Sequence, residues 1–352
     1  MGISITTVIR FYYPLALILL FWLYVILDSR RKPRRKIPIS VNYHFTRRCN
    51  YECGFCFHTA SDSYHEPLNR AYQGLSRLAL AGLRKLNFAG GEPFLYPKYL
   101  GQLAKYCKEE LSLESVSIVT NGSKVTETWM QEYGKYIDIM AISVDSFNEA
   151  TNVRIGRGKG DHLPSVVKCA KLCHRYGIKF KLNTVVNKYN FQEDMNEGIR
   201  EIAPFRWKCF QVLVVPGENE NSDRLRNAQD FVISDQQYQV FCDKHSHNKC
   251  FVHEPNGVMR SSYLILDEHM RFLNRPTQGA GKPTASILDV GVDKALEEVI
   301  WDEEGFKQRG GIYDWSRDKG LGVAYRKEVG KKEKVENEDG GAGCKTSKNM
   351  EW

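Results

Sequence analysis

Two hydrophobic patterns alternate along the chain from residue 40 onward. Short apolar stretches rich in β-branched residues are typical of buried strands, and the segments between them carry apolar residues at helical spacing. We expect strands at 40–45, 85–89, 115–120, 137–144, 179–186 and 207–215, and helices at 68–83, 99–111, 127–133, 163–176 and 194–202. Strands joined by crossover helices form a parallel sheet. The pattern therefore predicts an α/β fold, a partial TIM-like (βα)6 barrel.

Polar motifs follow the first four predicted strands at their carboxyl ends. They are Cys49 to His58, Gly90 to Pro93, Asn121-Gly122 and Ser143 to Ser146. In a barrel of parallel strands these ends form one rim, where the chemistry takes place. We therefore expect the four motifs to form one site.

Cys49, Cys53 and Cys56 have a C-x3-C-x2-C spacing. Three thiolates on one short loop indicate a metal site with one coordination position left open. A [4Fe-4S] cluster fits this pattern, because the amino and carboxylate groups of S-adenosylmethionine can bind the fourth iron. The alternative is a structural zinc ion with His58 as its fourth ligand.

Gly90 and Gly91 follow an apolar run, 86–89, and precede Glu92-Pro93. A glycine pair where a strand ends exposes backbone polar groups to a ligand. Alone this sequence could be an ordinary turn. Some forty residues after the cysteines, it is a candidate edge for binding the methionine amino group of S-adenosylmethionine.

Positive side chains mark the last two predicted strands. Alternate residues of a strand share a face, so Lys181 and Asn183 point the same way, as do Arg206 and Lys208. Unpaired cations inside a barrel are costly, and neither strand supplies an acid. An external anion such as a triphosphate would satisfy several of them at once. The alternative is that Arg206 and Lys208, at the start of their strand, are solvated.

The first 36 residues have a different character. Residues 11–27 contain no charge, and as a helix they would be about 25 Å long, close to the thickness of a hydrocarbon core. A basic run from Arg30 to Lys36 follows, which argues against a cleavable signal peptide and suits anionic lipid headgroups. We expect residues 5–36 to attach the protein to a membrane, with the rest of the chain in the cytosol.

Composition limits the remaining functions. The net charge of +8 includes six basic residues in that one run, so a basic surface for binding nucleic acid is not indicated. The other seven of the ten cysteines read as small buried residues rather than a disulfide framework. Residues 1–36 are expected to be the anchor and linker, 37–316 the catalytic domain, and 317–352 a polar tail that is largely disordered.

The flanking residues narrow the family. The segments around 40–46, 121–123, 155–158, 206–208, 263–268, 270–274 and 286–292, together with the cysteine loop and the Gly90-Gly91-Glu92-Pro93 motif, resemble the viperin family of radical S-adenosylmethionine enzymes. The similarity extends from about Val41 to Trp315. The resemblance implies a barrel of the radical S-adenosylmethionine type.

The family's activity implies a function for this chain. A 5'-deoxyadenosyl radical would take the 4'-hydrogen of CTP, and loss of the 3'-hydroxyl would give 3'-deoxy-3',4'-didehydro-CTP, an antiviral chain terminator. The alternatives are another nucleotide such as UTP, or a membrane-bound scaffold whose cluster is only structural. The family also implies the cytosolic face of the endoplasmic reticulum and lipid droplets as the location.

The resemblance also assigns residues. Contacts to S-adenosylmethionine are expected at Asn42, Tyr43, Phe55, Gly90, Gly91, Glu92, Asn121 and Ser143. Contacts to the nucleotide are expected at Lys85, Lys181, Asn183, Arg206, Lys208 and Arg309, with Lys282 the nearest substitute for a further lysine of the family. Tyr263 matches a tyrosine near the ribose that could quench the product radical, although a tyrosine in an apolar stretch is more often a core residue. The terminal Trp352, after an acidic residue, is similar to the peptide that engages the cytosolic iron-sulfur assembly machinery.

Overall fold

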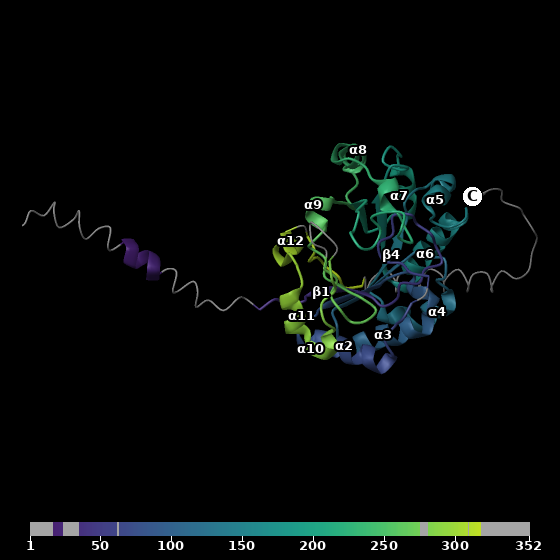
Figure 1. Cartoon of the computed structure of the whole chain (residues 1–352). Coiled ribbons are helices and arrows are strands. Elements are labelled where there is room, and N and C mark those ends of the chain that lie inside the picture. Colours follow the sequence, from purple (N-terminus) through teal and green to yellow (C-terminus); the bar gives the residue numbers. More distant parts are fainter. Residues whose placement is uncertain (1–16, 24–34, 62, 275–280, 309, 318–352) are drawn as a thin grey trace, which may run out of the picture. The chain divides into compact units, whose positions relative to one another are not determined.

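The computed structural model describes residues 17–23, 35–61, 63–274, 281–308 and 310–317 (Figure 1). The chain divides into two compact units, 1–36 and 37–352. In the first unit residues 17–23 are helical with exposed side chains. No helix among the described residues has both the length and the apolar character needed to cross a membrane. Most of the expected anchor, Arg309 and the tail with Trp352 lie outside the described residues.

The second unit is built on a parallel sheet. Its strands are β1 (Ser40–His44), β2 (Lys85–Ala89), β3 (Ser115–Thr120), β4 (Ile139–Ser143), β5 (Lys179–Val186), β6 (Arg206–Gln211), β7 (Phe251–Glu254) and β8 (Ile265–Leu266). Every pair is parallel, and the order across the sheet is β7-β6-β5-β4-β3-β2-β1-β8. Six strands stand in the predicted places. The prediction of six is corrected to eight among the described residues, because β7 and β8 are too short to give a periodic signal.

Helices cover the outer face of this curved sheet (Figure 1). Five coincide with the predicted segments: α2 (Leu68–Leu80), α3 (Pro97–Glu109), α4 (Glu127–Tyr133), α6 (His162–Tyr176) and α7 (Asn196–Ile202). The others are α5 (Glu149–Ile155), α8 (Asp235–His245), α9 (Asn256–Met259), α10 (Ile287–Val290), α11 (Val292–Glu298) and α12 (Glu303–Gln308), with 3-10 turns η1 (Pro93–Leu95), η2 (Gly134–Tyr136) and η3 (Ala228–Phe231). The connection after β4 therefore holds two helices, since Asn148 caps α5 and Gly156 ends it in the left-handed conformation.

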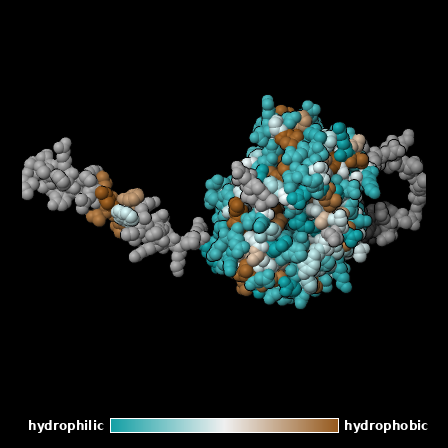
Figure 2. Space-filling view, viewed as in Figure 1, coloured by the Kyte–Doolittle hydropathy of each residue, from teal (hydrophilic) through white to brown (hydrophobic). Residues whose placement is uncertain are grey.

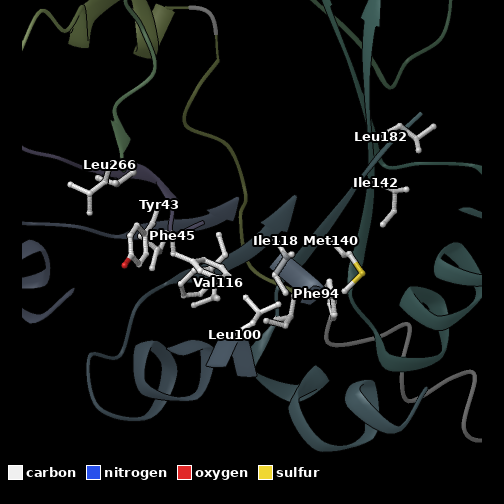
Figure 3. Packing of buried hydrophobic residues seen from close by; sticks show 14 of the residues in the cluster. Tyr43, Phe45, Phe94, Leu100, Val116, Ile118, Met140, Ile142, Leu182 and Leu266 are labelled. Atoms are coloured by element: carbon white, nitrogen blue, oxygen red, sulfur yellow. The ribbon is translucent and has the colours of Figure 1, made fainter. Parts of the chain in front are cut away.

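The hydrophobic core lies between the sheet and these helices. Tyr43 of β1, Val116 and Ile118 of β3 and Leu100 of α3 are fully buried there (Figure 3). Because side chains alternate along a strand, the neighbouring positions point into the lumen of the partial barrel. The outer surface seen in Figure 2 is mostly hydrophilic with scattered hydrophobic residues. The core thus fixes which side chains of each strand can form a site.

Candidate active site

A deep pocket fills the lumen. Its lining comes from the inward positions of β1 to β6, such as Asn42, Asn87, Ser117, Ala141 and Asn183. At the carboxyl ends of the strands, where one rim was predicted, the lining comes from the cysteine loop and from part of each motif: Gly90, Gly91 and Glu92 after β2, Asn121 after β3 and Ser143 at the end of β4. At the opposite end it is lined by lysines. The pocket therefore has two chemically different ends.

The cysteine loop is held by the end of α5. The N–H of Glu52 donates to the carbonyl of Gly156 (2.9 Å), and the N–H of Gly54 donates to that of Ile155 (3.0 Å). Gly156 has φ +88°, and a Cβ there would lie 2.3 Å from the carbonyl oxygen of Glu52. Only glycine permits both this backbone conformation and this close approach. The sequence Ile155-Gly156 is thus a seat for the cysteine loop.

The three thiols fit an iron-sulfur cluster. Cys49, Cys53 and Cys56 all line the pocket and none forms a disulfide. Burial raises the pKa of Cys49 and Cys53 to about 12 and that of Cys56 to about 11. Bound iron would make them thiolates, and a cluster held by three ligands keeps one iron free for S-adenosylmethionine. Among the described residues no three His, Cys, Asp or Glu side chains form a site for a single metal ion.

His58, the alternative fourth ligand, lies in another environment. It is buried, with Nε2 3.4 Å from Oε2 of Glu268 and its ring 4.7 Å from that of His44. Glu268 also accepts a hydrogen bond from Arg47 (2.8 Å). Burial alone would raise the pKa of the Glu268 carboxyl. Its contacts with His58 and, to a smaller extent, with Arg47 lower that pKa to about 2. His58 therefore packs beside Glu268 and His44, and it is not among the residues that line the pocket with the three cysteines.

The glycine pair joins β2 to the segment that enters the cysteine loop. The N–H of Gly91 donates to the carbonyl of Thr46 (2.7 Å), and the N–H of Glu92 donates to that of Arg48 (2.8 Å). A Cβ on Gly91 would lie 2.0 Å from the Arg48 oxygen, and one on Gly90 2.3 Å from the Thr46 oxygen. The two glycines thus let two backbones run in contact along the rim.

Glu92 and Asn121 tie this edge to the next strand. The buried Glu92 carboxylate accepts hydrogen bonds from Thr120 Oγ1 (2.6 Å), the Asn121 N–H (2.8 Å) and the Phe94 N–H (2.9 Å). The Asn121 amide donates to Asn50 of the cysteine loop (2.9 Å). The two side chains therefore hold three rim segments in fixed positions, as well as lining the pocket.

Of the other residues expected to contact S-adenosylmethionine, three line the pocket and one has a side chain that points into the outer core. Asn42, Phe55 and Ser143 line the pocket, and Asn42 accepts a hydrogen bond from Asn87 (2.9 Å). Tyr43 does not reach it: its ring is fully buried on the outer face of β1, 6.0 Å from that of Phe45. As the neighbour of two inward residues, its side chain must face the core.

Arg157 is a site residue that sequence reasoning did not assign. Its buried guanidinium lines the pocket, pairs with Asp145 and lies 6.0 Å from the Phe55 ring centroid. Burial alone would lower the pKa of Arg157, but the charges of Asp145 and Cys53 raise it. The guanidinium therefore stays positive beside the thiols. A buried cation at this rim suits the carboxylate of a ligand. Gly156 before it is a typical helix end, but a helix end does not indicate where the next side chain points.

The opposite end of the lumen is cationic. Lys85 and Lys181 line the pocket, and Arg206 lies near them behind the lining. Burial and the charges of Lys208 and Arg206 lower the pKa of Lys85 to about 7, and burial lowers that of Lys181 well below its ordinary value. Within the described part of the chain Lys181 has no hydrogen-bonded or ionic partner. Asn183 Oδ1 and Arg206 Nε are also buried without one. Such groups indicate a site for an anion.

Lys208 differs from the expectation of an unpaired cation. It forms an ion pair with Glu254 of β7 and donates to Tyr263 Oη (2.7 Å), and that hydroxyl donates to Glu254 (2.9 Å). The acid was missed because β7 was missed. β7 and β8 are the two edges of the sheet, and Tyr263 lies just before β8 in the chain. The triad of Lys208, Glu254 and Tyr263 therefore bridges the opening of the partial barrel. Tyr263 lines the pocket rather than the outer core.

The last described segment closes the cationic end. Tyr313 Oη accepts a hydrogen bond from Lys85 (3.1 Å), and its ring lies 4.4 Å from the Arg206 guanidinium. Lys179 pairs with Asp314 (2.9 Å), and Ser115 donates to the Trp315 carbonyl (3.2 Å). Lys282 is exposed and does not line the pocket, in contrast to its expected role. Residues 311–315 thus form the floor of the pocket.

Comparison with known proteins gives the family. A model of the radical SAM superfamily matches residues 43–202. The chain is 52% identical over 284 residues to the S-adenosylmethionine-dependent nucleotide dehydratase RSAD2 of Oncorhynchus mykiss, covering 80% of this chain and 81% of that protein. The corresponding RSAD2 of Danio rerio is 53% identical over 284 residues (80% and 79% covered).

Solved structures share the fold. The native enzyme anSMEcpe with bound AdoMet has a TM-score of 0.58 at 15% identity, covering 86% of this chain and all of that one. Streptococcus suis SuiB bound to S-adenosylmethionine has a TM-score of 0.57 at 15% identity, with 78% and 68% covered. The chain therefore belongs to the viperin (RSAD2) family of S-adenosylmethionine-dependent nucleotide dehydratases, radical SAM enzymes that use a [4Fe-4S] cluster and S-adenosylmethionine.

Proposed function

We propose that the nucleotide is CTP and that the product is 3'-deoxy-3',4'-didehydro-CTP, an antiviral chain terminator. The observation that supports a triphosphate is the cationic end of the lumen, where Lys85 and Lys181 line the pocket near Arg206 and where the described residues leave Arg206 Nε and Asn183 Oδ1 buried without a hydrogen-bond partner. A triphosphate would supply the missing negative charge there.

The two ends of the pocket suit the two halves of the reaction. When bound, the cluster supplies an electron that splits the sulfonium bond of S-adenosylmethionine. Cys49, Cys53 and Cys56 would hold the cluster, and the rim formed by Gly90, Gly91, Ser143 and Arg157 would hold S-adenosylmethionine. Phosphates bound by the lysines would place the ribose between these ends, beside the polar chain formed by Asn42, Asn87 and Ser117. Positioning by both ends brings the 4'-hydrogen toward the radical centre.

A panel of nucleotides tests the choice of base. The protein, reconstituted with iron and sulfide without oxygen, is given S-adenosylmethionine and a reductant with CTP, UTP, ATP or GTP. We expect 5'-deoxyadenosine to rise well above background with CTP, together with a product one water lighter than CTP. A larger yield with UTP would support the alternative substrate. Equal yields with and without every nucleotide would favour a structural cluster.

Tyr263 is proposed as the donor that quenches the product radical. Its hydroxyl lines the pocket and is held by Lys208 and Glu254, so its position is fixed without a nucleotide. We expect Tyr263→Phe to retain cleavage of S-adenosylmethionine while nucleotide product falls at least about tenfold, because phenylalanine has no O–H hydrogen atom (one electron with one proton) to give to the radical. Mass analysis of one reaction measures the ratio of nucleotide product to 5'-deoxyadenosine. An unchanged ratio would contradict the assignment.

We further propose that residues 5–36 hold the enzyme on the cytosolic face of the endoplasmic reticulum and on lipid droplets, and that Trp352 engages the cytosolic iron-sulfur assembly machinery. The support is the apolar run before a basic one, and the acidic-aromatic end of the chain. Imaging of the full chain beside a variant that lacks residues 1–36 tests the first. Iron content of a variant that lacks Trp352, purified from cells, tests the second.

A further inference from the structure

A small basic and aromatic patch lies on the outer side of the cysteine loop. Tyr189 carries two cations over its ring: the Arg154 guanidinium at 4.2 Å and the Lys188 ammonium at 5.0 Å from the centroid. Both cations are exposed. Throughout the described ranges, neither has a carboxylate partner within ion-pair distance. Their charge is therefore available to another molecule.

Exposed apolar side chains flank these cations. Val153 precedes Arg154 and is 48% exposed, and Val232, which follows η3, is 45% exposed. Arginine and aromatic residues such as Arg154 and Tyr189 are enriched at surfaces that bind a partner protein. We call Val153, Arg154, Lys188, Tyr189 and Val232 the basic patch. Its positive charge suits an acidic partner.

The basic patch is connected to the cysteine loop by ring contacts. The Tyr189 ring lies 5.4 Å from that of Phe231, which lies 5.7 Å from the ring of Phe55, between Cys53 and Cys56. Gly54 is packed so tightly on Phe231 that a Cβ would lie 2.3 Å from its ring. Arg154 also belongs to the helix whose end seats the loop. Two residue contacts thus separate this surface from the loop of the cluster.

The chemistry of the cluster requires a partner of this kind. Each reductive cleavage of S-adenosylmethionine consumes one electron, and the pocket that holds the substrate is closed at its far end by residues 311–315. An electron carrier is therefore expected to approach the cluster from the side of the cysteine loop. We propose that the basic patch is the docking site of an acidic one-electron carrier protein of the flavodoxin class. The carrier loses one electron and the cluster gains it, with no bond made or broken.

The test uses a reduced flavodoxin as the probe and the reconstituted full chain. The variant Arg154→Glu/Lys188→Glu reverses both exposed charges, and Lys98→Glu/Lys294→Glu makes the same change in net charge on exposed residues of α3 and α11, away from α5 (Figure 1). The rate at which the EPR signal of the reduced cluster appears is measured in each, and titanium(III) citrate serves as a small reductant. Affinity for oxidised flavodoxin is measured by calorimetry.

We expect the patch variant to lose about 10- to 100-fold in both the rate with flavodoxin and the affinity, because each lost charge pair is replaced by a repulsive one. Its iron content and its rate with titanium(III) citrate should match the wild type. An equal loss in the control variant would overturn the proposal in favour of net charge alone, and so would an unchanged patch variant. If iron content falls, Lys188→Glu alone, which leaves the loop-bearing α5 unchanged, is compared with Lys98→Glu as its control. None of these readouts depends on the nucleotide, so the proposed substrate can fail separately.

Discussion

Replacing Cys53 by alanine is expected to abolish the enzyme's chemistry while leaving the fold intact. Cys53 is one of three thiols of the rim, and a [4Fe-4S] cluster held by two cysteines is not retained. We expect iron to fall from about four atoms per chain in the reconstituted wild type to below one, and formation of 5'-deoxyadenosine to fall to background. Iron analysis and EPR spectroscopy after reduction measure both.

Cys173→Ala is the matched control. Cys173 is fully buried in α6, and burial raises its pKa far above the ordinary value, so it is an inert core residue. The Cys173→Ala protein should lose about 1 kcal/mol of its free energy of unfolding because of the small cavity, and it should keep its iron. Full iron in Cys53→Ala, or equal loss of iron in both variants, would contradict the assignment of the cluster to the cysteine loop.

Replacing Lys181 by methionine is expected to give the second largest effect, on nucleotide affinity. Its ammonium lines the pocket and has no protein partner among the described residues. A hydrogen bond to a charged group is worth about 1.5 to 3 kcal/mol, so the dissociation constant of the nucleotide should rise about 10- to 100-fold. Equilibrium binding measures this, with Lys171→Met on the exposed face of α6 as control. Unchanged affinity would remove Lys181 from the site.

The same site should give nucleotide binding a characteristic pH dependence. The pKa of Lys85 is about 7 in the free protein, because burial and the neighbouring cations disfavour its charge. A bound triphosphate favours the charged form and raises that pKa, so binding takes up a proton. Affinity should therefore be full below pH 7 and fall as the pH rises above it. Lys85→Arg, which stays charged, should reduce that slope.

How far the site could be predicted depended on the distance between its parts in the sequence. The cysteine spacing and the glycine pair are local signals, and period-two alternation placed Lys181 and Asn183 in the lumen. Glu254 and Arg157 gave no comparable signal. Glu254 lies on a strand of four residues, and Arg157 acts through a loop about a hundred residues earlier in the chain. Tyr43 was assigned to the site by the family resemblance, but it lies between Asn42 and His44, which line the pocket, and alternation along the strand turns its side chain outward.

The sequence by itself determined six of the eight strands in the described part of the chain, five of the helices that join them and the cluster motif, because each depends on residues close together in the chain. Tertiary structure alone decided that Lys208 is neutralised by Glu254 and Tyr263 across the open edges of the sheet, and that residues 311–315 close the cationic end. It also decided that Arg154 and Lys188 meet over one ring beside the cysteine loop. These contacts join segments that no short-range pattern relates, since packing of the whole sheet brings them together.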